Sequence, residues 1–321
     1  MSKLLFVCGF PGGGTDLTKT ILNAHPNIYI NGEMPFLKNI AHYGYSQETI
    51  FTHISEIRAF QRVLAQINTW SNIENINYDF SIEMDAKGVL RLDQVLQICF
   101  SRHNSQIWGN KTPQNTENIA LLSTLFPDAR FLIVTRDVRD VCLSWKNKWG
   151  KDMIWCAAKW TQRMKKGWLA TQYILPERYL FVKFEDILSD TETACRKICH
   201  FLDIPFSDRM LEHHEHTTRK IDGKLNYGQP VKKDNKRKWE KQLSVETVRR
   251  IEEITLDTMN LLDYEAKYAT TRQPISDWET WRGKWNDWWA LLLVGNRASQ
   301  QNGIGRRLQD LAFEFKKQFV K

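Results

Sequence analysis

Near its start the chain reads Leu4-Leu5-Phe6-Val7-Cys8, then Gly9-Phe10-Pro11-Gly12-Gly13-Gly14-Thr15-Asp16, then Leu17-Thr18-Lys19-Thr20-Ile21-Leu22. The first run is apolar throughout, which is typical of a parallel strand buried on both faces. The last run has apolar residues at helical spacing, and His25-Pro26 ends it. A strand, a glycine-rich loop and a helix in this order form the first half of a βαβ unit. The stretch therefore predicts an α/β fold.

The glycine-rich loop also predicts an anion site. Backbone N–H groups in such a turn, together with a helix N-terminus, form a concave site for negative charge. Gly12, Gly13 and Gly14 allow the main chain to approach a ligand closely. Thr15-Asp16 stands where the ATP-binding P-loop has Lys-Ser/Thr, and this disfavours a kinase or an ATPase. A tight turn that binds nothing is the alternative.

The rest of the chain alternates predicted strands with predicted helices. Strands are predicted at 107–109, 131–135 and 179–182, and helices at 116–125, 152–173 and 191–202. This alternation predicts a P-loop-like parallel sheet flanked by helices on both faces. A mostly helical insertion, at about 34–104, is the natural place for a substrate-facing element. We predict one domain over residues 1–270.

A second candidate site follows the predicted strand 131–135. The segment Arg136-Asp137-Val138-Arg139-Asp140-Val141-Cys142-Leu143-Ser144 places a cation where open α/β sheets bind ligands. Arg136 offers a rigid fork for a phosphate, and Ser144 offers a hydroxyl two helical turns later. Asp137 and Asp140 can hold the loop or cap the helix. The alternative is a surface cluster of charges that pair with one another.

Residues 271–321 differ in character from the rest. Trp278, Trp281, Trp285, Trp288 and Trp289 recur at helical spacing, and a second amphipathic stretch carries Leu308, Leu311, Phe315 and Phe319. We predict a tryptophan-rich helical extension whose aromatic face packs on the main domain. A homodimer interface, a lid over the acceptor pocket and a peripheral membrane contact are the alternatives.

Bulk composition narrows the class of partner. The 321 residues carry a net charge of +8, which favours an anionic ligand. No base-reading motif accompanies the basic run Lys232 to Lys241, so nucleic acid is disfavoured. No apolar run is long enough for a membrane span. The six cysteines show no metal or CxxC spacing, which predicts buried free thiols and a cytoplasmic protein.

His213-His214-Glu215-His216 is interpreted as a solvated polar turn rather than a metal site. No metal is expected.

Taken together, these segments resemble the superfamily of sulfotransferases that use 3′-phosphoadenosine-5′-phosphosulfate (PAPS), in particular the branch with bacterial members and tyrosylprotein sulfotransferases. The resemblance covers about Lys3 to Tyr264. Further matches occur in the family's order: His25-Pro26, Gly32-Glu33, Gly109 to Pro113, Phe126 to Arg130, Phe184 to Leu188, Phe201 to Pro205 and Lys238-Trp239.

The resemblance implies transfer of a sulfuryl group from PAPS to a hydroxyl or nitrogen of a small acceptor, with release of 3′-phosphoadenosine-5′-phosphate (PAP). It implies that Glu33 is the catalytic base and that Lys111 stabilises the transferring group. It assigns the loop Gly12 to Asp16 to the 5′-phosphosulfate, and Arg136, Ser144 and Lys238 to the 3′-phosphate. The stretch 223–232 matches a loop that closes over the nucleotide.

Without the resemblance, Glu33 could be a helix cap and Lys111 a surface lysine.

The chain departs from the family at the loop. Gly12-Gly13 replaces a basic residue followed by Ser, and Asp16 replaces a hydroxyl residue. Either Lys111 or Lys19 compensates for the lost cation, or Asp16 faces the acceptor. Asp16 and the carboxylates of the insertion suggest a cationic acceptor, such as a guanidinium alkaloid of the saxitoxin type. A catalytically inactive PAP-binding protein and a P-loop kinase are the competing interpretations.

Overall fold

The computed structural model describes residues 3–46, 48–67, 78–100, 105–217, 221–222, 225–226 and 228–294. The chain divides into two compact units, which are described separately below. The first combines residues 1–135 with 166–232, and the second combines 136–165 with 233–321.

A five-stranded parallel sheet in the order β2-β5-β1-β6-β7 is the centre of the first unit. Its strands are β1 (Lys3–Gly9), β2 (Ile28–Asn31), β5 (Ile107–Lys111), β6 (Arg130–Thr135) and β7 (Tyr179–Lys183). Val7 of β1 pairs with Lys111 of β5 and with Leu132 of β6. The predicted strands are therefore confirmed. With the helices described below, the predicted α/β class is confirmed as well.

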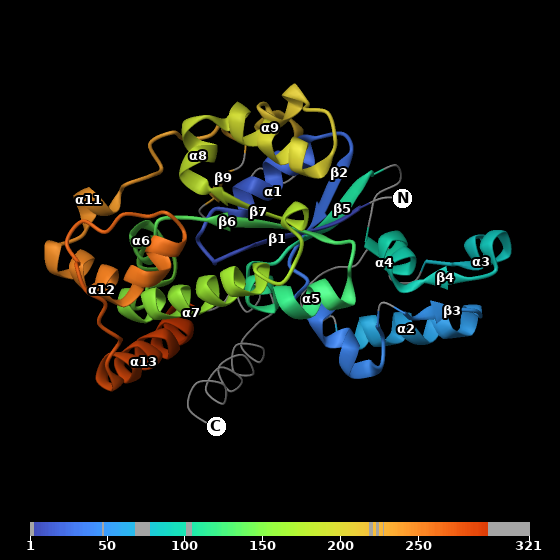
Figure 1. The fold of residues 1–321 in the computed structure, drawn as a ribbon, viewed down its shortest axis with the longest axis horizontal. Coiled ribbons are helices and arrows are strands. Elements are labelled where there is room, and N and C mark those ends of the chain that lie inside the picture. The colour runs from blue at the N-terminus through green and yellow to red at the C-terminus, as the bar shows by residue number, and fades with distance from the viewer. Residues whose placement is uncertain are drawn as a thin grey trace. The chain divides into compact units, whose positions relative to one another are not determined.

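Helices cover both faces of this sheet (Figure 1). Figure 1 shows α1 (Thr15–Ala24), α8 (Phe184–Ser189) and α9 (Thr191–Leu202) on one side, and α5 (Ile119–Leu125) on the other. Leu5 and Val7 share a buried core with residues of α1, α8 and α9. Phe6 points the other way, and its ring stacks on Phe131 with centroids 5.4 Å apart. Alternate residues of each strand thus supply two cores.

The segment between β2 and β5 is mostly helical where it is described. It contains the 3₁₀ helix η1 (Pro35–Tyr43), α2 (Ile54–Ile67), α3 (Ser81–Lys87) and α4 (Leu92–Phe100). Two short strands, β3 (Ile50–Phe51) and β4 (Leu90–Arg91), pair antiparallel. The predicted helix 116–125 begins instead as the 3₁₀ helix η2 (Pro113–Asn118), after which α5 follows.

Short elements complete the first unit: η3 (Pro176–Arg178), η4 (Asp208–Met210), α10 (His213–His216), β8 (Ile221–Asp222) and β9 (Leu225–Asn226). The interpretation of the histidine cluster as a solvated turn is wrong for His213. This residue begins α10, and its side chain is fully buried. Burial first, and then the neighbouring His214, lowers the pKa of His213 to about 4.

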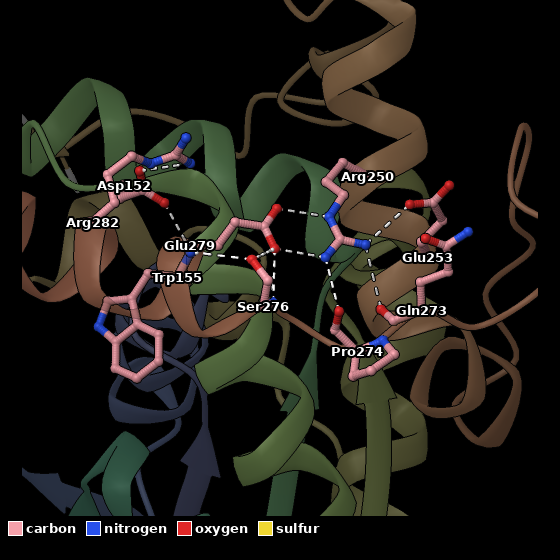
Figure 2. A network of polar contacts seen from close by, with 9 residues as sticks. All are labelled: Asp152, Trp155, Arg250, Glu253, Gln273, Pro274, Ser276, Glu279 and Arg282. Atoms are coloured by element: carbon pink, nitrogen blue, oxygen red, sulfur yellow. Dashed lines mark hydrogen bonds and ion pairs between the residues drawn. The ribbon is translucent and has the colours of Figure 1, made fainter.

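The second unit is helical where it is described. It contains α6 (Val138–Trp149), α11 (Trp239–Gln242), α12 (Val245–Leu261) and α13 (Asp277–Val294). Helix α7 (Met153–Thr171) begins in this unit and ends in the first. Arg250 of α12 holds the start of α13 through Glu279, at 2.8 and 2.7 Å (Figure 2). Ser276 and Glu279 form a capping box, with each main-chain N–H donating to the other residue's side chain.

The face that α13 uses for packing differs from the prediction. Gly283, Asp287 and Ala290 are buried, and Gly283 lies so close to Trp155 of α7 that a Cβ there would meet it at 2.3 Å. Trp278, by contrast, is 63% exposed, and Trp281 and Trp289 are also exposed. Small and acidic residues therefore make the close contact. The second amphipathic stretch, Leu308 to Phe319, lies outside the described residues.

All six cysteines are free and buried, as predicted. Cys8, Cys99, Cys195 and Cys199 belong to the first unit, and Cys142 and Cys156 to the second. Burial raises the pKa of Cys199 to about 11 and that of Cys195 to about 12. Within the described part of the chain, no helix combines the length and apolar character that crossing a bilayer needs.

Candidate active site

Lys111 is the centre of a polar cluster at the carboxyl end of the sheet. It is the last residue of β5, and its Nζ lies 2.8 Å from Oδ1 of Asp16 and 2.7 Å from Oε1 of Glu33. The Lys111 side chain is only 6% exposed, whereas those of Asp16 and Glu33 are 42% and 45% exposed. A nearly buried ammonium therefore bridges two carboxylates that reach solvent. Ligands of open α/β sheets bind at this edge.

Neighbouring elements explain why these three side chains meet. Asp16 is in the first turn of α1, and Glu33 follows β2 by two residues. The N–H of Met34 donates to the Thr112 hydroxyl at 2.8 Å. That hydroxyl in turn donates to Oδ1 of Asn110 at 2.8 Å, and all three groups are buried. The main chain beside Glu33 is thus tied to the residue that follows Lys111.

The two neighbouring carboxylates decide the protonation state of Lys111. Burial alone would lower the pKa of Lys111, but the charges and hydrogen bonds of Asp16 and Glu33 outweigh it, so the pKa is raised. Lys111 is therefore an ammonium at neutral pH. One positive and two negative groups leave this cluster with one net negative charge.

The glycine loop is shaped by contacts that exclude side chains. Gly14, the N-cap of α1, has φ +96°, and a Cβ there would lie 2.1 Å from the Phe184 ring. A Cβ on Gly13 would lie 2.8 Å from the carbonyl oxygen of Phe10. Gly14 itself makes no side-chain cap hydrogen bond to the first turn of α1. At these glycines the loop therefore presents main chain, which fits the 5′ end of an anionic nucleotide.

Thr116 fixes the strand end that enters this loop. Its buried hydroxyl accepts a hydrogen bond from the N–H of Gly9 at 2.7 Å and donates one to the Gly9 carbonyl at 2.8 Å. Sequence reasoning missed this residue, because a threonine 107 positions away carries no local signal of such a contact.

The residues predicted for the 3′-phosphate belong to the second unit. Arg136 is largely buried, and its Nη2 donates to the Asn235 carbonyl at 3.2 Å. Ser144 is half-buried on α6. Lys238 is exposed and directly precedes α11. A guanidinium, a hydroxyl and an ammonium are a suitable donor set for a phosphate.

A buried ion network supports this region, and sequence reasoning missed most of it. Asp137 caps α6 as predicted, because it accepts the N–H of Arg139 at 2.9 Å. The Arg139 guanidinium also donates to Oδ1 and Oδ2 of Asp137, at 2.9 and 2.7 Å, and to Glu252 at 2.6 Å. Glu252 is fully buried and accepts three main-chain N–H groups, those of Lys267, Tyr268 and Ala269. The charges therefore lie in an interior, not on a surface.

The predicted site residues thus form two groups. Asp16, Glu33 and Lys111 meet beside the loop residues Gly12 to Thr15 in the first unit, and Arg136, Ser144 and Lys238 belong to the second. Of the predicted nucleotide-closing stretch 223–232, residues 223, 224 and 227 lie outside the described residues. No group of His, Cys, Asp or Glu within the described ranges is arranged to hold a metal.

Comparison with known proteins adds to this geometry. A family model, described as the sulfotransferase family, matches residues 5–208. A putative protein-tyrosine sulfotransferase of Caenorhabditis briggsae is 25% identical over 227 residues, which cover 68% of this chain and 72% of the relative. Protein-tyrosine sulfotransferase 2 of Gallus gallus is 28% identical over 229 residues, which cover 66% and 54%. The match with the Drosophila melanogaster protein-tyrosine sulfotransferase likewise spans only about half (52%) of that protein.

Two solved structures share the fold. A sulfotransferase domain from the curacin biosynthetic pathway superposes with a TM-score of 0.53 at 15% identity, over 83% of this chain and 99% of that one. A sulfotransferase domain from a Synechococcus olefin synthase gives a TM-score of 0.52 at 17% identity, over 78% and 95%. At such identities the similarity establishes the fold alone.

Proposed function

The chain belongs to the sulfotransferase family, and from that membership we propose that it moves a sulfuryl group from PAPS to a hydroxyl or nitrogen of a small-molecule acceptor and releases PAP. The observation that carries this proposal is the bridge from Lys111 to Glu33 and Asp16 beside the glycine loop. The bridge provides a cation and a solvent-accessible carboxylate, and the adjacent glycine loop provides a main-chain anion site.

In this proposal Glu33 accepts the proton that the acceptor loses as it attacks. Its carboxylate is 45% exposed, so an acceptor can reach it, while the buried Lys111 ammonium holds one of its oxygens at 2.7 Å. Lys111 itself donates a hydrogen bond to the transferring group. Its positive charge stabilises the negative charge that builds on the leaving oxygen during an in-line displacement. Since Lys111 is held by two carboxylates, it keeps its charge and position before the reaction begins.

Two sets of residues would hold the co-substrate. The main chain of Gly12 to Asp16, at the N-terminus of α1, suits the 5′-phosphosulfate, because Gly12, Gly13 and Gly14 leave its backbone without side chains at three successive positions. Arg136, Ser144 and Lys238 suit the 3′-phosphate, because they supply cationic and hydroxyl donors. PAPS supplies the activated sulfuryl group when it is bound.

Asp16 supports a cationic acceptor. The cluster carries one net negative charge, and its Asp16 and Glu33 side chains are the parts that reach solvent. A guanidinium or ammonium group on the acceptor would balance that charge, whereas a neutral phenol would not. Guanidinium alkaloids of the saxitoxin type have this chemistry, and we propose them as the first acceptors to test.

The experiment combines binding with turnover. Calorimetry with PAP and with ATP–Mg²⁺ identifies the nucleotide, and release of PAP from PAPS is measured with a saxitoxin-type alkaloid, a simple phenol and a tyrosine peptide. Glu33→Gln should lower kcat by about 10²–10³-fold and leave the Kd for PAP within about twofold. Glu48→Gln, an exposed carboxylate between η1 and β3, is the matched control.

The outcomes separate the competing functions. Full turnover by Glu33→Gln at saturating acceptor would exclude the general-base role. PAP binding without turnover on any acceptor would favour an inactive nucleotide-binding protein, and a preference for ATP–Mg²⁺ would favour a kinase. Asp16→Asn should raise KM for the alkaloid and leave KM for the phenol unchanged. Equal effects on both acceptors would refute the cationic class.

A further inference from the structure

The basic run Lys232 to Lys241 is held in shape by a residue of α6. Asp140, in the first turn of that helix, is buried, and its Oδ2 accepts the N–H of Arg237 at 2.7 Å. Its Oδ1 accepts the N–H of Trp239 at 3.1 Å. Both of these bonds go to main-chain groups almost a hundred residues further along the chain. One carboxylate therefore fixes the path of the main chain on both sides of Lys238.

The conformation of Arg237 shows that this path needs support. Arg237 has φ +53°, in the left-handed region that residues with a Cβ rarely adopt. Among the described residues, only Asp203 and Asp263 share a positive φ without being glycine. Aspartate tolerates this region better than arginine does, since its short side chain can bond locally. The bond from Arg237 N–H to Asp140 supplies external support where the residue type supplies none.

Two further contacts hold the ends of the same segment. The Arg139 guanidinium lies 3.9 Å from the ring centroid of Trp239, and Asp137 and Glu252 fix that guanidinium in turn. At the other end, Arg136 donates to the Asn235 carbonyl at 3.2 Å. The segment Asn235–Trp239 is thus attached to α6 and the residues before it at its start, its middle and its end.

We propose that Asp140 is a positioning residue that shapes the segment Asn235–Trp239 so that Lys238 faces the 3′-phosphate of the nucleotide. This inference rests on the proposed function, because it assumes that PAP or PAPS is the ligand. Asp140 touches no ligand in this scheme. It acts through the backbone of Arg237 and Trp239, and it keeps exposed cations at a fixed place instead of leaving them to sample many positions.

The test compares two nucleotides that differ only in the 3′-phosphate. Kd values for PAP and AMP are measured by calorimetry, with AMP in competition format, for wild type and Asp140→Asn. The asparagine side chain replaces one of the two accepting oxygens with an NH₂ group, so one of the two N–H groups loses its acceptor. We expect the Kd for PAP to rise about tenfold, which corresponds to about 1.4 kcal/mol, while the Kd for AMP stays within about twofold. Asp257→Asn, an exposed carboxylate on α12, is the matched control and should change neither.

A second variant tests the proposed cause. Glycine occupies the left-handed region at little cost, so Arg237→Gly removes the need for support from Asp140. In the Arg237→Gly background, Asp140→Asn should therefore raise the Kd for PAP by less than about threefold. If Asp140 had a merely structural role, Asp140→Asn would lower the PAP affinity by the same factor in both backgrounds. Circular dichroism and a cooperative thermal transition verify that each variant is folded.

Each outcome decides one question. If wild type binds PAP no more tightly than AMP, the proposed function fails, and the inference fails with it. If wild type prefers PAP and Asp140→Asn keeps that preference, only the inference is refuted. An equal rise in both Kd values would also refute it. If neither Asp140→Asn nor the double variant folds, Asp140 is required for folding and the positioning role is rejected.

Discussion

Glu279→Gln should lower the free energy of unfolding by about 1.5 kcal/mol at pH 7. The Glu279 carboxylate accepts two hydrogen bonds from Arg250, at 2.8 and 2.7 Å, and two from Ser276, both at 2.9 Å (Figure 2). These contacts, with Arg250 foremost, lower the pKa of Glu279 from 4.5 to about 2. At about 1.36 kcal/mol per pKa unit, the full shift corresponds to about 3.4 kcal/mol. Solvent still reaches the pair, so roughly half of that is expected.

The pH dependence follows from the direction of this shift. Because the pKa of Glu279 is lower in the folded than in the unfolded chain, its stabilisation is complete above about pH 4.5 and is lost as the pH falls towards 2. The difference between wild type and Glu279→Gln should therefore shrink along the same range. Urea unfolding followed by tryptophan fluorescence, at pH 7, 4.5 and 3, measures it. The five tryptophans of α13 lie near the substitution.

Two further variants make this test decisive. Combining Glu279→Gln with Arg250→Met should give a coupling free energy of about 1 kcal/mol. Asp277→Asn removes an exposed charge from the same first turn of α13 and should cost less than about 0.5 kcal/mol. A Glu279→Gln effect that is equal at pH 7 and pH 3, or a coupling below about 0.3 kcal/mol, would show that the reasoning is wrong.

Four other substitutions probe the first unit and the end of α6. Gly14→Ala should lower the free energy of unfolding by more than about 3 kcal/mol, because its Cβ would meet Phe184 at 2.1 Å. Gly150→Ala is the control: it is also at positive φ but in open space, and it should lower the free energy of unfolding by about 1 kcal/mol in the same urea assay. Thr116→Val should lower the free energy of unfolding by about 2 kcal/mol, since it removes a buried hydroxyl that makes two hydrogen bonds to the end of β1. An unchanged urea midpoint would contradict this. Burial lowers the pKa of His213 from 6.5 to about 4, so stability should fall by up to about 3 kcal/mol as the pH drops from 6.5 to 4, and His213→Phe should remove that part of the pH profile.

The sheet of the first unit was predictable because buried parallel strands are continuous apolar runs. The run Phe131 to Thr135 corresponds to β6 with one residue added, and the predicted helix 191–202 has the bounds of α9. Local pattern is enough for such elements, because burial on both faces constrains every residue. The histidines of α10 show the limit, since a polar composition does not reveal that one side chain is buried.

The site was only partly predictable. Family resemblance selected Glu33 and Lys111, but the sequence left two roles open for Asp16, and only the structure shows it paired with Lys111. The contact between Arg139 and Glu252 joins residues 113 positions apart, and no local periodicity encodes such a pair. For α13, tryptophans at spacings of three and four predicted a helix but not which face is buried. Gly283 lies directly against Trp155, because it lacks a side chain.

The cysteines offer a way to follow the opening of the molecule without altering it. An alkylating reagent reacts with thiolate, so a thiol that is buried and has a raised pKa stays inert until the surrounding chain opens. Four of these reporters lie in the unit with the sheet and two in the helical unit. Mass spectrometry of a labelling time course would therefore time the exposure of each unit separately, in the unmodified chain.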